Sequence, residues 1–544
     1  MTTFYTFPSR FCSILIASSL LWGCSQENSN PSSDKTTISS ISGNVARIAT
    51  DSDPLSLDPR LIRELGSINI INTLFEGLMK TGADQKPEFA IAKSVDISPD
   101  QLTYTFTLRE STWSDKTPLT SNDFAETWLS ILNPAFPAPN AYMLYAIKGA
   151  KAAKEGLLPL EEVEIKATSP TTLVIQLEQP TPYFLELLTG YFFFPVSSAM
   201  RNQTINPTSS PEKLVGNGPF KMVQWKQRDE IIVIKNPNYW NAEAIKLDGI
   251  AFQVLDDNTA LQLFKVGKLD WAGSPISTLP QDSILSLKEA GNLKIAPAAG
   301  THWLRFNTQK TPFNYLNMRI AFNSAINRQT IVEHITQGNQ LPAMGVIPPS
   351  FGTGKQEYYK DNDLLTSQKY YMASLIDLKN AGEKLPEISL CYSSGNDRNR
   401  KIAQAIQQQW NKAFGILLKL ESCETQVLFD KLRNGNYQLS LGSWYADIRD
   451  PINFLEIFKT KETPTNNTFW ENARFSELLE LSSRESSPEK RNELLSQAES
   501  VLMQELPVAP LFHGSFNYLV NPRLKDVKVS ESGIMNFKQA SITE

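Results

Sequence analysis

The chain has 544 residues, of which 41% are hydrophobic, 20% charged and 10% aromatic. This composition is typical of a soluble globular protein, and the length suggests about three or four domains, so a single small module and a disordered chain are both excluded. The 52 Lys and Arg residues against 57 Asp and Glu residues give a net charge of −5. Because the sequence also lacks a basic tract, we expect no nucleic acid partner.

The N-terminus predicts a secretion signal. Residues 1–23 carry a single charge, Arg10, followed by an apolar run that is too short to cross a bilayer and is typical of a signal peptide. Residues 21–24 (LWGC) resemble the bacterial lipobox, in which the cysteine is diacylated and becomes the first residue of the mature chain. Acylated Cys24 would tether the protein to a membrane without a transmembrane helix. The alternative is an ordinary signal peptide with a coincidental cysteine.

Residues 24–44 follow the signal and are rich in Ser, Asn and Thr, with few large apolar side chains. Such a segment cannot bury enough surface to offset its ordering entropy, so it predicts a flexible stalk. No later stretch predicts a membrane span, because the most apolar candidate, Tyr183 to Val196, is interrupted by Glu186 and Pro195. We therefore expect a lipid-anchored protein in the periplasm or cell envelope.

Two cysteines, Cys391 and Cys423, remain in the folded body, because Cys12 leaves with the signal and Cys24 carries the lipid. Two cysteines in an oxidising compartment can pair. Both lie in or next to predicted strands that a single helix connects. The sequence leaves two alternatives open: a disulfide, or two inert buried thiols.

Taken in chain order, the first clear elements are half-exposed strands. Apolar residues alternate with polar ones between Val95 and Trp113, and again from Leu173 to Leu177. Proline-rich connections separate these strands from helical stretches. No repeat with a period of about 20 to 50 residues is present, so a solenoid or a propeller is not expected.

A strand–helix–strand unit is predicted in the second half of the chain. Residues 388–392 and 416–420 are apolar strands, and apolar side chains at helical spacing lie between them, at residues 402–414. A helix at 426–433 and a third strand at 437–441 extend this unit toward a parallel sheet covered by helices. Such sheets bind ligands beyond the carboxyl ends of their strands.

Aromatic and charged side chains follow that third strand, at the expected ligand edge. They include Ser443, Trp444, Tyr445 and Asp447. An acidic residue among aromatics in a closable cleft suits the neutralisation of a buried cation, such as the α-ammonium of a peptide. The alternative for Asp447 is a helix cap or a turn residue before Asp450.

Catalytic motifs are absent from the sequence. It lacks HExxH, CxxC, GxSxG, GxGxxG and the P-loop pattern, and its three histidines are His302, His334 and His513. A metal site built from several His or Cys ligands is therefore not expected. We predict a chain without catalytic residues, cofactor or metal.

Seven motifs in order along the chain resemble those of the extracytoplasmic solute-binding proteins of ABC importers, in the oligopeptide and dipeptide-binding family. They are LSLDP (55–59), LFEGL (74–78), LTYTFTLRESTWSDKTPLT (102–120), GNGPF (216–220), NPNYW (236–240), AFNSAINRQTI (321–331) and GSWYADIRDPINFL (442–455). The resemblance covers the chain from about Val45 to its end.

That resemblance implies an α/β fold, the two-lobed periplasmic-binding-protein fold, with two crossing segments and an extra small α+β domain. One lobe would be built from residues 45–75, 196–300 and 509–544, and the other from 301–508. Residues 76–195 would form the extra domain.

The resemblance also implies roles for single residues. Asp447, at the aspartate position of the WxAD motif, would pair with the N-terminal ammonium of a peptide. Arg63 and Leu65 fall where relatives contact the ligand near its start, and Arg398 and Arg400 could reach a ligand carboxylate. Further cleft candidates, with core packing as the alternative, are Tyr142, Tyr145, Phe512 and His513.

The implied function is peptide transport. The lobes would close on an extended peptide, and a monomer would deliver it to the permease of an ABC importer. One alternative keeps the architecture and changes the cargo to a cell-wall peptide, a metal chelate or haem, and Arg63 motivates it because an added cation suits an acidic ligand. Rivals from other classes are a secreted peptidase or glycan hydrolase, and an adhesin or surface scaffold.

Overall fold

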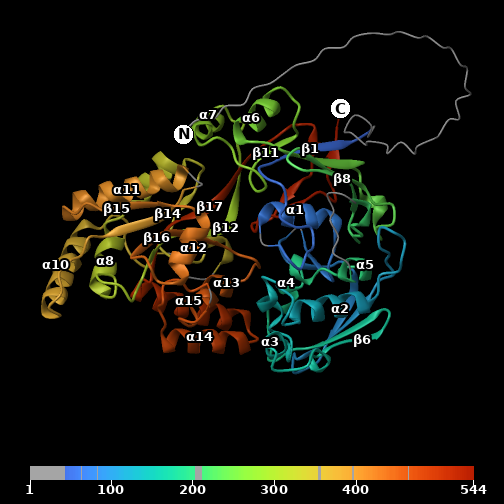
Figure 1. Ribbon diagram of the computed structural model, residues 1–544, viewed down its shortest axis with the longest axis horizontal. Coiled ribbons are helices and arrows are strands. Elements are labelled where there is room, and N and C mark those ends of the chain that lie inside the picture. Colours follow the sequence, from blue (N-terminus) through green and yellow to red (C-terminus); the bar gives the residue numbers. More distant parts are fainter. Residues whose placement is uncertain are drawn as a thin grey trace, which may run out of the picture.

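The computed structural model describes residues 43–62, 64–82, 84–202, 211–352, 357–394, 397–463 and 465–543. The predicted signal peptide, Cys24, nearly all of the predicted stalk, and Arg63 lie outside the described residues. The described chain forms two lobes side by side, joined by long strands near the centre (Figure 1). No helix within these ranges is long and apolar enough to cross a membrane.

One mixed sheet of eleven strands runs through both lobes. Its order is β15-β14-β16-β12-β17-β11-β1-β10-β9-β8, with β13 paired to β17. The strands are β1 Val45–Thr50, β8 Phe220–Lys226, β9 Glu230–Lys235, β10 Gly249–Val254, β11 Trp271–Gly273, β12 Lys294–Phe306, β13 Leu341–Pro342, β14 Ser389–Ser393, β15 Lys419–Cys423, β16 Leu439–Tyr445 and β17 Val508–Val520.

Strands β12 and β17, of 13 residues each, cross between the lobes. They pair antiparallel with each other from Lys294, opposite Tyr518, to Arg305, opposite Val508. At one end β17 pairs with β11, and at the other end β12 pairs with β16. The two crossing segments expected from the sequence are therefore neighbouring strands of one sheet. The register of this pair shifts between Pro297 and Thr301.

The lobe that holds β1 and β8–β11, the first lobe, carries the C-terminal segment and the extra domain. Its further elements are α1 Leu65–Leu74, α5 Ser198–Asn202, α6 Asp257–Lys265, α7 Ile284–Glu289, β18 Leu524–Lys525, β19 Lys528–Val529, β20 Met535–Asn536 and β21 Ser541–Ile542. Short 3-10 turns lie at Pro211–Lys213, Ala242–Ala244 and Gln281–Ser283.

The extra domain is built on an antiparallel four-stranded sheet, β4-β5-β7-β6, which confirms the two alternating strands predicted there. Helix α2 (Ser121–Leu132) covers it and begins with a capping box between Thr120 and Asp123. The remaining elements are β2 Met79–Thr81, β3 Pro87–Phe89, β4 Ala92–Ile97, β5 Thr103–Leu108, η2 Ala141–Leu144, α3 Ala150–Lys154, η3 Leu160–Glu162, β6 Ile165–Ser169, β7 Thr172–Gln176, α4 Phe184–Leu187 and η4 Tyr191–Phe193. One hydrophobic core runs through this domain and the first lobe. The predicted boundaries at residues 76 and 195 stay predictions.

The second lobe confirms the predicted strand–helix–strand unit. Strands β14 and β15 are parallel and flank α11 (Asp397–Phe414), whose Ile402, Ile406 and Trp410 are buried at helical spacing. Strand β15 begins at Lys419, three residues later than expected, because Gly415 ends α11 in the left-handed region and residues 416–418 form the connection.

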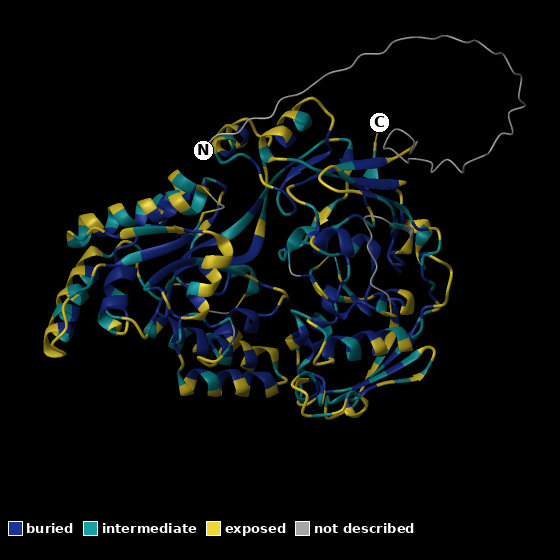
Figure 2. Cartoon of the chain, in the orientation of Figure 1, coloured by how far each residue is buried: buried dark blue, intermediate teal, exposed yellow. Residues whose placement is uncertain are grey.

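Helices cover the second lobe's part of the sheet, with their exposed residues facing outward (Figure 2). Strand β16 is parallel to β14 but antiparallel to β12, so the sheet is mixed where the sequence indicated a parallel one. The remaining elements are α8 Leu316–Ser324, α9 Arg328–Ile331, η8 Val332–Thr336, η9 Pro349–Phe351, α10 Leu364–Asn380, α12 Thr425–Arg433, α13 Ile452–Leu455, η10 Glu456–Phe458, α14 Ala473–Arg484 and α15 Pro488–Glu505.

Cys391 and Cys423 are buried free thiols, so the structure agrees with the expectation of two buried thiols and contradicts the possible disulfide. The reason is the register of β14 and β15, which places Cys391 opposite Glu421 and Cys423 opposite Ser393. The Cys391 thiol donates a hydrogen bond to the Glu421 carboxylate, 3.4 Å away. Burial and this carboxylate raise the pKa of Cys391 to about 12, which keeps the thiol protonated.

Glu499 is a carboxyl group buried in the second lobe, where α15 supports the chain at residues 345–347. It accepts hydrogen bonds from the backbone N–H of Ile347 at 2.9 Å and from the hydroxyl of Tyr358 at 2.8 Å. Burial outweighs these bonds and raises the pKa of Glu499 from 4.5 to about 7.

The free energy of unfolding should therefore depend on the protonation of Glu499. Because the folded chain binds this proton more tightly, the stabilisation is complete below pH 4.5 and is lost as pH rises to about 7. We expect a loss of about 3 kcal/mol over that interval. Urea unfolding at pH 5 and pH 7 would measure it, with Glu499→Gln as the non-titrating variant. Equal pH dependence in the two proteins would contradict this assignment.

Candidate ligand-binding cleft

The segment after β16 is held in place by Asn453. The Asn453 side-chain oxygen accepts a hydrogen bond from the Trp444 indole at 3.0 Å and another from the backbone N–H of Asp447 at 3.1 Å. The two carboxylate oxygens of Asp450 accept hydrogen bonds from Nη1 and Nη2 of Arg491, at 2.7 and 2.9 Å. Both side chains are about nine-tenths buried. The loop that carries Asp447 is therefore braced on the second lobe at both of its ends.

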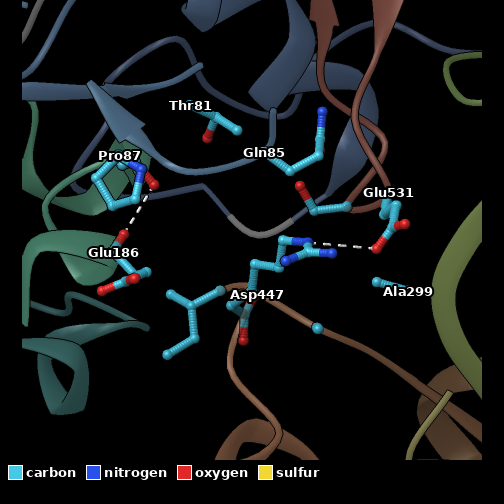
Figure 3. Close-up of a pocket in the computed structure, with 12 residues that line it drawn as sticks. Thr81, Gln85, Pro87, Glu186, Ala299, Asp447 and Glu531 are labelled. Carbon is cyan, nitrogen blue, oxygen red and sulfur yellow. Dashed lines mark hydrogen bonds and ion pairs between the residues drawn. The ribbon is translucent and has the colours of Figure 1, made fainter. Parts of the chain in front are cut away.

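Asp447 is exposed and lines a cavity between the lobes. The cavity has a volume of about 40 Å³, and Figure 3 shows Asp447 together with Glu186 of the extra domain and Glu531 of the first lobe. The rest of the lining is Thr81, Gln85, Pro87, Thr189, Ala299, Ala446, Ile448, Arg449 and Ser532. Three carboxylates against one arginine make this end of the cleft suited to a cation.

The carboxylate of Glu186 contributes to the negative charge of this cavity. It is half-buried, and desolvation raises its pKa, with the nearby Asp450 acting in the same direction. A cation entering the cavity would meet this carboxylate as well as that of Asp447.

A second cavity, of about 170 Å³, lies where β16 meets the start of α11. Arg398, Ser443 and Phe512 line it together with His302, Trp303, Asn399, Ile402, Leu441, Gly442 and Leu511. Arg398 is the charged residue of that lining, which contains neither Asp nor Glu. This cavity is suited to an anion.

Aromatic residues form the wall between β12, β16 and β17. The His302 ring stacks on Phe512, with centroids 4.5 Å apart, and its Nε2 is 2.9 Å from the Tyr445 hydroxyl. Burial, and secondarily the charge of Arg398, lowers the pKa of His302 well below its usual range. Burial raises the pKa of Tyr445. Both groups are therefore neutral near pH 7 and act as hydrogen-bonding groups.

His513 is buried behind this wall. Its Nδ1 is 2.9 Å from the hydroxyl of Thr301, which donates its proton to the carbonyl of Val346 at 2.8 Å. Nδ1 of His513 is therefore protonated and donates a hydrogen bond to the hydroxyl oxygen of Thr301. Burial lowers the pKa of His513 to about 4, and this position fits core packing, the alternative given above.

The other residues singled out from the sequence lie elsewhere. Arg400 is exposed and pairs with Asp397 one turn away on α11. Tyr142 is 45% exposed on η2, and Tyr145, which follows η2, packs against the core of the extra domain. Leu65 is half-buried at the start of α1. None of the four lines either cavity.

Sequence reasoning missed several residues of the cleft. Asn453 carried no signal, because an amide next to a short helix is common. Glu186 was considered only as an interruption of an apolar run, and Ile448 and Glu531 were not considered. Residues that belong to different lobes come together only through the fold.

Two lobes joined by two crossing strands, with a cavity between them, define the class as the two-lobed periplasmic-binding-protein fold. In the part of the chain that the structure describes, no group of three or more His, Cys, Asp or Glu residues could hold a metal ion.

Comparison with known proteins narrows this class. The chain belongs to the bacterial extracellular solute-binding proteins, family 5, because the model of that family's middle region matches residues 86–466. It is 38% identical to the oligopeptide-binding protein OppA of Bacillus subtilis over 95% of both chains.

Solved structures agree. A periplasmic oligopeptide-binding protein of an ABC transporter from Borrelia burgdorferi is 28% identical, with a TM-score of 0.80 over 92% of this chain and 100% of that chain. Listeria monocytogenes OppA, solved with a bound peptide, is 26% identical, with a TM-score of 0.77 over 92% of this chain and 99% of that one.

Proposed function

We propose that this protein binds peptides between its two lobes and delivers them to the permease of an ABC importer. The observation that carries the proposal is the position of Asp447, on a braced loop at the end of β16 and in the cavity between the lobes. The relatives that bind oligopeptides support the choice of ligand. The protein would act as a carrier without catalysis and as a monomer.

The charges of the two cavities support one orientation of the peptide. The α-ammonium group would pair with Asp447, in the cavity lined by three carboxylates. The carboxylate would point toward Arg398, in the cavity without acidic residues. The backbone of the peptide would lie along the aromatic wall formed by Tyr445 and His302.

The spacing of the cavities predicts the length of the preferred peptide. Ser443, in β16, lines one cavity, and Asp447, two residues beyond the end of that strand, lines the other. A chain rises about 3.3 Å per residue when fully extended, so the two positions are at most about 13 Å apart, within the reach of an extended peptide of about four residues. Tetrapeptides should therefore bind more tightly than dipeptides.

Arg398→Gln should weaken the binding of tetraalanine about tenfold, because a charge-assisted hydrogen bond to the peptide carboxylate is lost. Arg400→Gln, on the same helix but paired with Asp397 in solvent, is the matched control and should change the affinity little. Isothermal titration calorimetry with tetraalanine and its C-terminal amide would measure both. An equal loss for the acid and the amide would contradict the role of Arg398.

The N-terminus supports a location outside the cytoplasm. We propose that residues 1–23 are removed as a signal peptide and that Cys24 is acylated. Residues 24–44 would then connect the lipid anchor to the folded body, in the periplasm or cell envelope.

Identification of the co-purified ligand tests the function directly. Native mass spectrometry of the protein purified under mild conditions should show bound peptides, which peptide sequencing would identify. A metal chelate or haem would appear in the mass and in the absorbance spectrum and would support the alternative cargo. Turnover of a peptide library would indicate an enzyme and contradict the proposal.

A further inference from the structure

The residue that follows Asp447 is buried in the opposite lobe. Ile448 is 5% exposed and belongs to the hydrophobic core that runs through the first lobe and the extra domain. The other buried members of this core in the described chain come from residues 46–276 and 524–540. Ile448 comes from a loop of the second lobe. Its side chain is therefore buried across the cleft, in the core of the first lobe.

Arg449, the next residue, also joins the lobes. Its Nε is 3.6 Å from the carboxylate of Glu531 in the first lobe, and its Nη2 donates a hydrogen bond of 3.2 Å to the carbonyl of Ser350 in the second lobe. Because Arg449 is exposed, this ion pair contributes little free energy by itself. The larger contribution to the contact comes from the buried side chain of Ile448.

The loop is rigid on the side of the second lobe. Asn453 holds the backbone of Asp447, and the buried guanidinium of Arg491 holds Asp450. The ring of Tyr183, from the extra domain, lies 5.2 Å from that guanidinium and is a further contact across the cleft. Ile448 therefore cannot stay in the core of the first lobe when the lobes separate, and opening exposes it to water.

We propose that Ile448 is a positioning residue that couples ligand capture to closure of the lobes. Its burial favours the closed arrangement, in which Asp447 is brought into the cavity with Glu186 and Glu531. A ligand that pairs with Asp447 therefore binds to a state that Ile448 has already stabilised. This inference rests on the proposed function only for the identity of the ligand.

Ile448→Ala should lower the affinity for tetraalanine about 10- to 100-fold, because the closed state loses the buried side chain. It should also shift the ligand-free protein toward an open arrangement. Paired spin labels on exposed positions of the two lobes would measure the distance distribution, and calorimetry would measure the affinity. Ile448→Val, which keeps most of the buried surface, should show a smaller shift in the same direction.

Ile388→Ala is the matched control. Ile388 is 3% exposed but belongs to a core of the second lobe alone, so its truncation should lower thermal stability and leave the distance distribution unchanged. An unchanged distribution in Ile448→Ala, or an affinity within threefold of the original, would overturn the inference. If tetraalanine does not bind the unaltered protein, the proposed ligand is wrong, while the ligand-free distances still decide the role of Ile448.

Discussion

Asp447→Ala should weaken the binding of tetraalanine by about two to three and a half orders of magnitude. In the liganded closed cleft the carboxylate would be paired with the α-ammonium of the peptide, and removing one partner of a buried ion pair costs about 3 to 5 kcal/mol. The half-buried Glu186 beside it offers only partial compensation. Isothermal titration calorimetry at constant ionic strength would measure the loss.

Two controls separate the charge from the shape of the Asp447 side chain. Asp447→Asn keeps the size of the side chain but loses its charge, so it should lose most of the same affinity. N-acetylated tetraalanine lacks the ammonium group and should bind the unaltered protein as weakly as tetraalanine binds Asp447→Ala. A loss of less than threefold in either variant would count against the pairing.

Asp450→Ala should lower the free energy of unfolding of the second lobe by about 3 to 5 kcal/mol, because it leaves the buried Arg491 guanidinium without its carboxylate. Arg491 retains its bond to the carbonyl of Ser482 and its contact with the ring of Tyr183, neither of which replaces the carboxylate. Urea unfolding followed by tryptophan fluorescence would measure the change.

Asp397→Ala is the matched control for this prediction. Asp397 also pairs with an arginine, Arg400, but both side chains are about half exposed, so its removal should leave the unfolding curve unchanged within error. Equal effects of the two substitutions would show that burial of the Asp450–Arg491 pair does not matter.

The parts of the fold that follow from local patterns could be predicted from the sequence. The strand–helix–strand unit around α11 was predicted because its apolar residues have a helical period between two apolar strands. The place of Asp447 at the end of β16 followed from the same pattern together with the resemblance to a known family. The two crossing segments followed from the resemblance alone.

The rest of the site depends on contacts between distant segments. An isoleucine in a polar loop, such as Ile448, gives no sign that it enters the core of another lobe. Arg398 and Arg400 are equivalent in the sequence, and only the direction of α11 places Arg398 in a cavity and Arg400 in solvent. Cys391 and Cys423 lie on neighbouring strands as expected. The pairing register of β14 and β15, however, does not place them opposite each other.

The pairing of β12 with β17 has a mechanical consequence. Two separate linkers could bend independently, whereas two hydrogen-bonded strands must twist together as one ribbon, so opening of the lobes is a torsion of that ribbon. The ladder is interrupted between Pro297 and Thr301, where the residues are Ala298, Ala299 and Gly300. Because the residues there are small, we expect the twist to concentrate at this interruption, beside Gly300, whose backbone pairs with Tyr445.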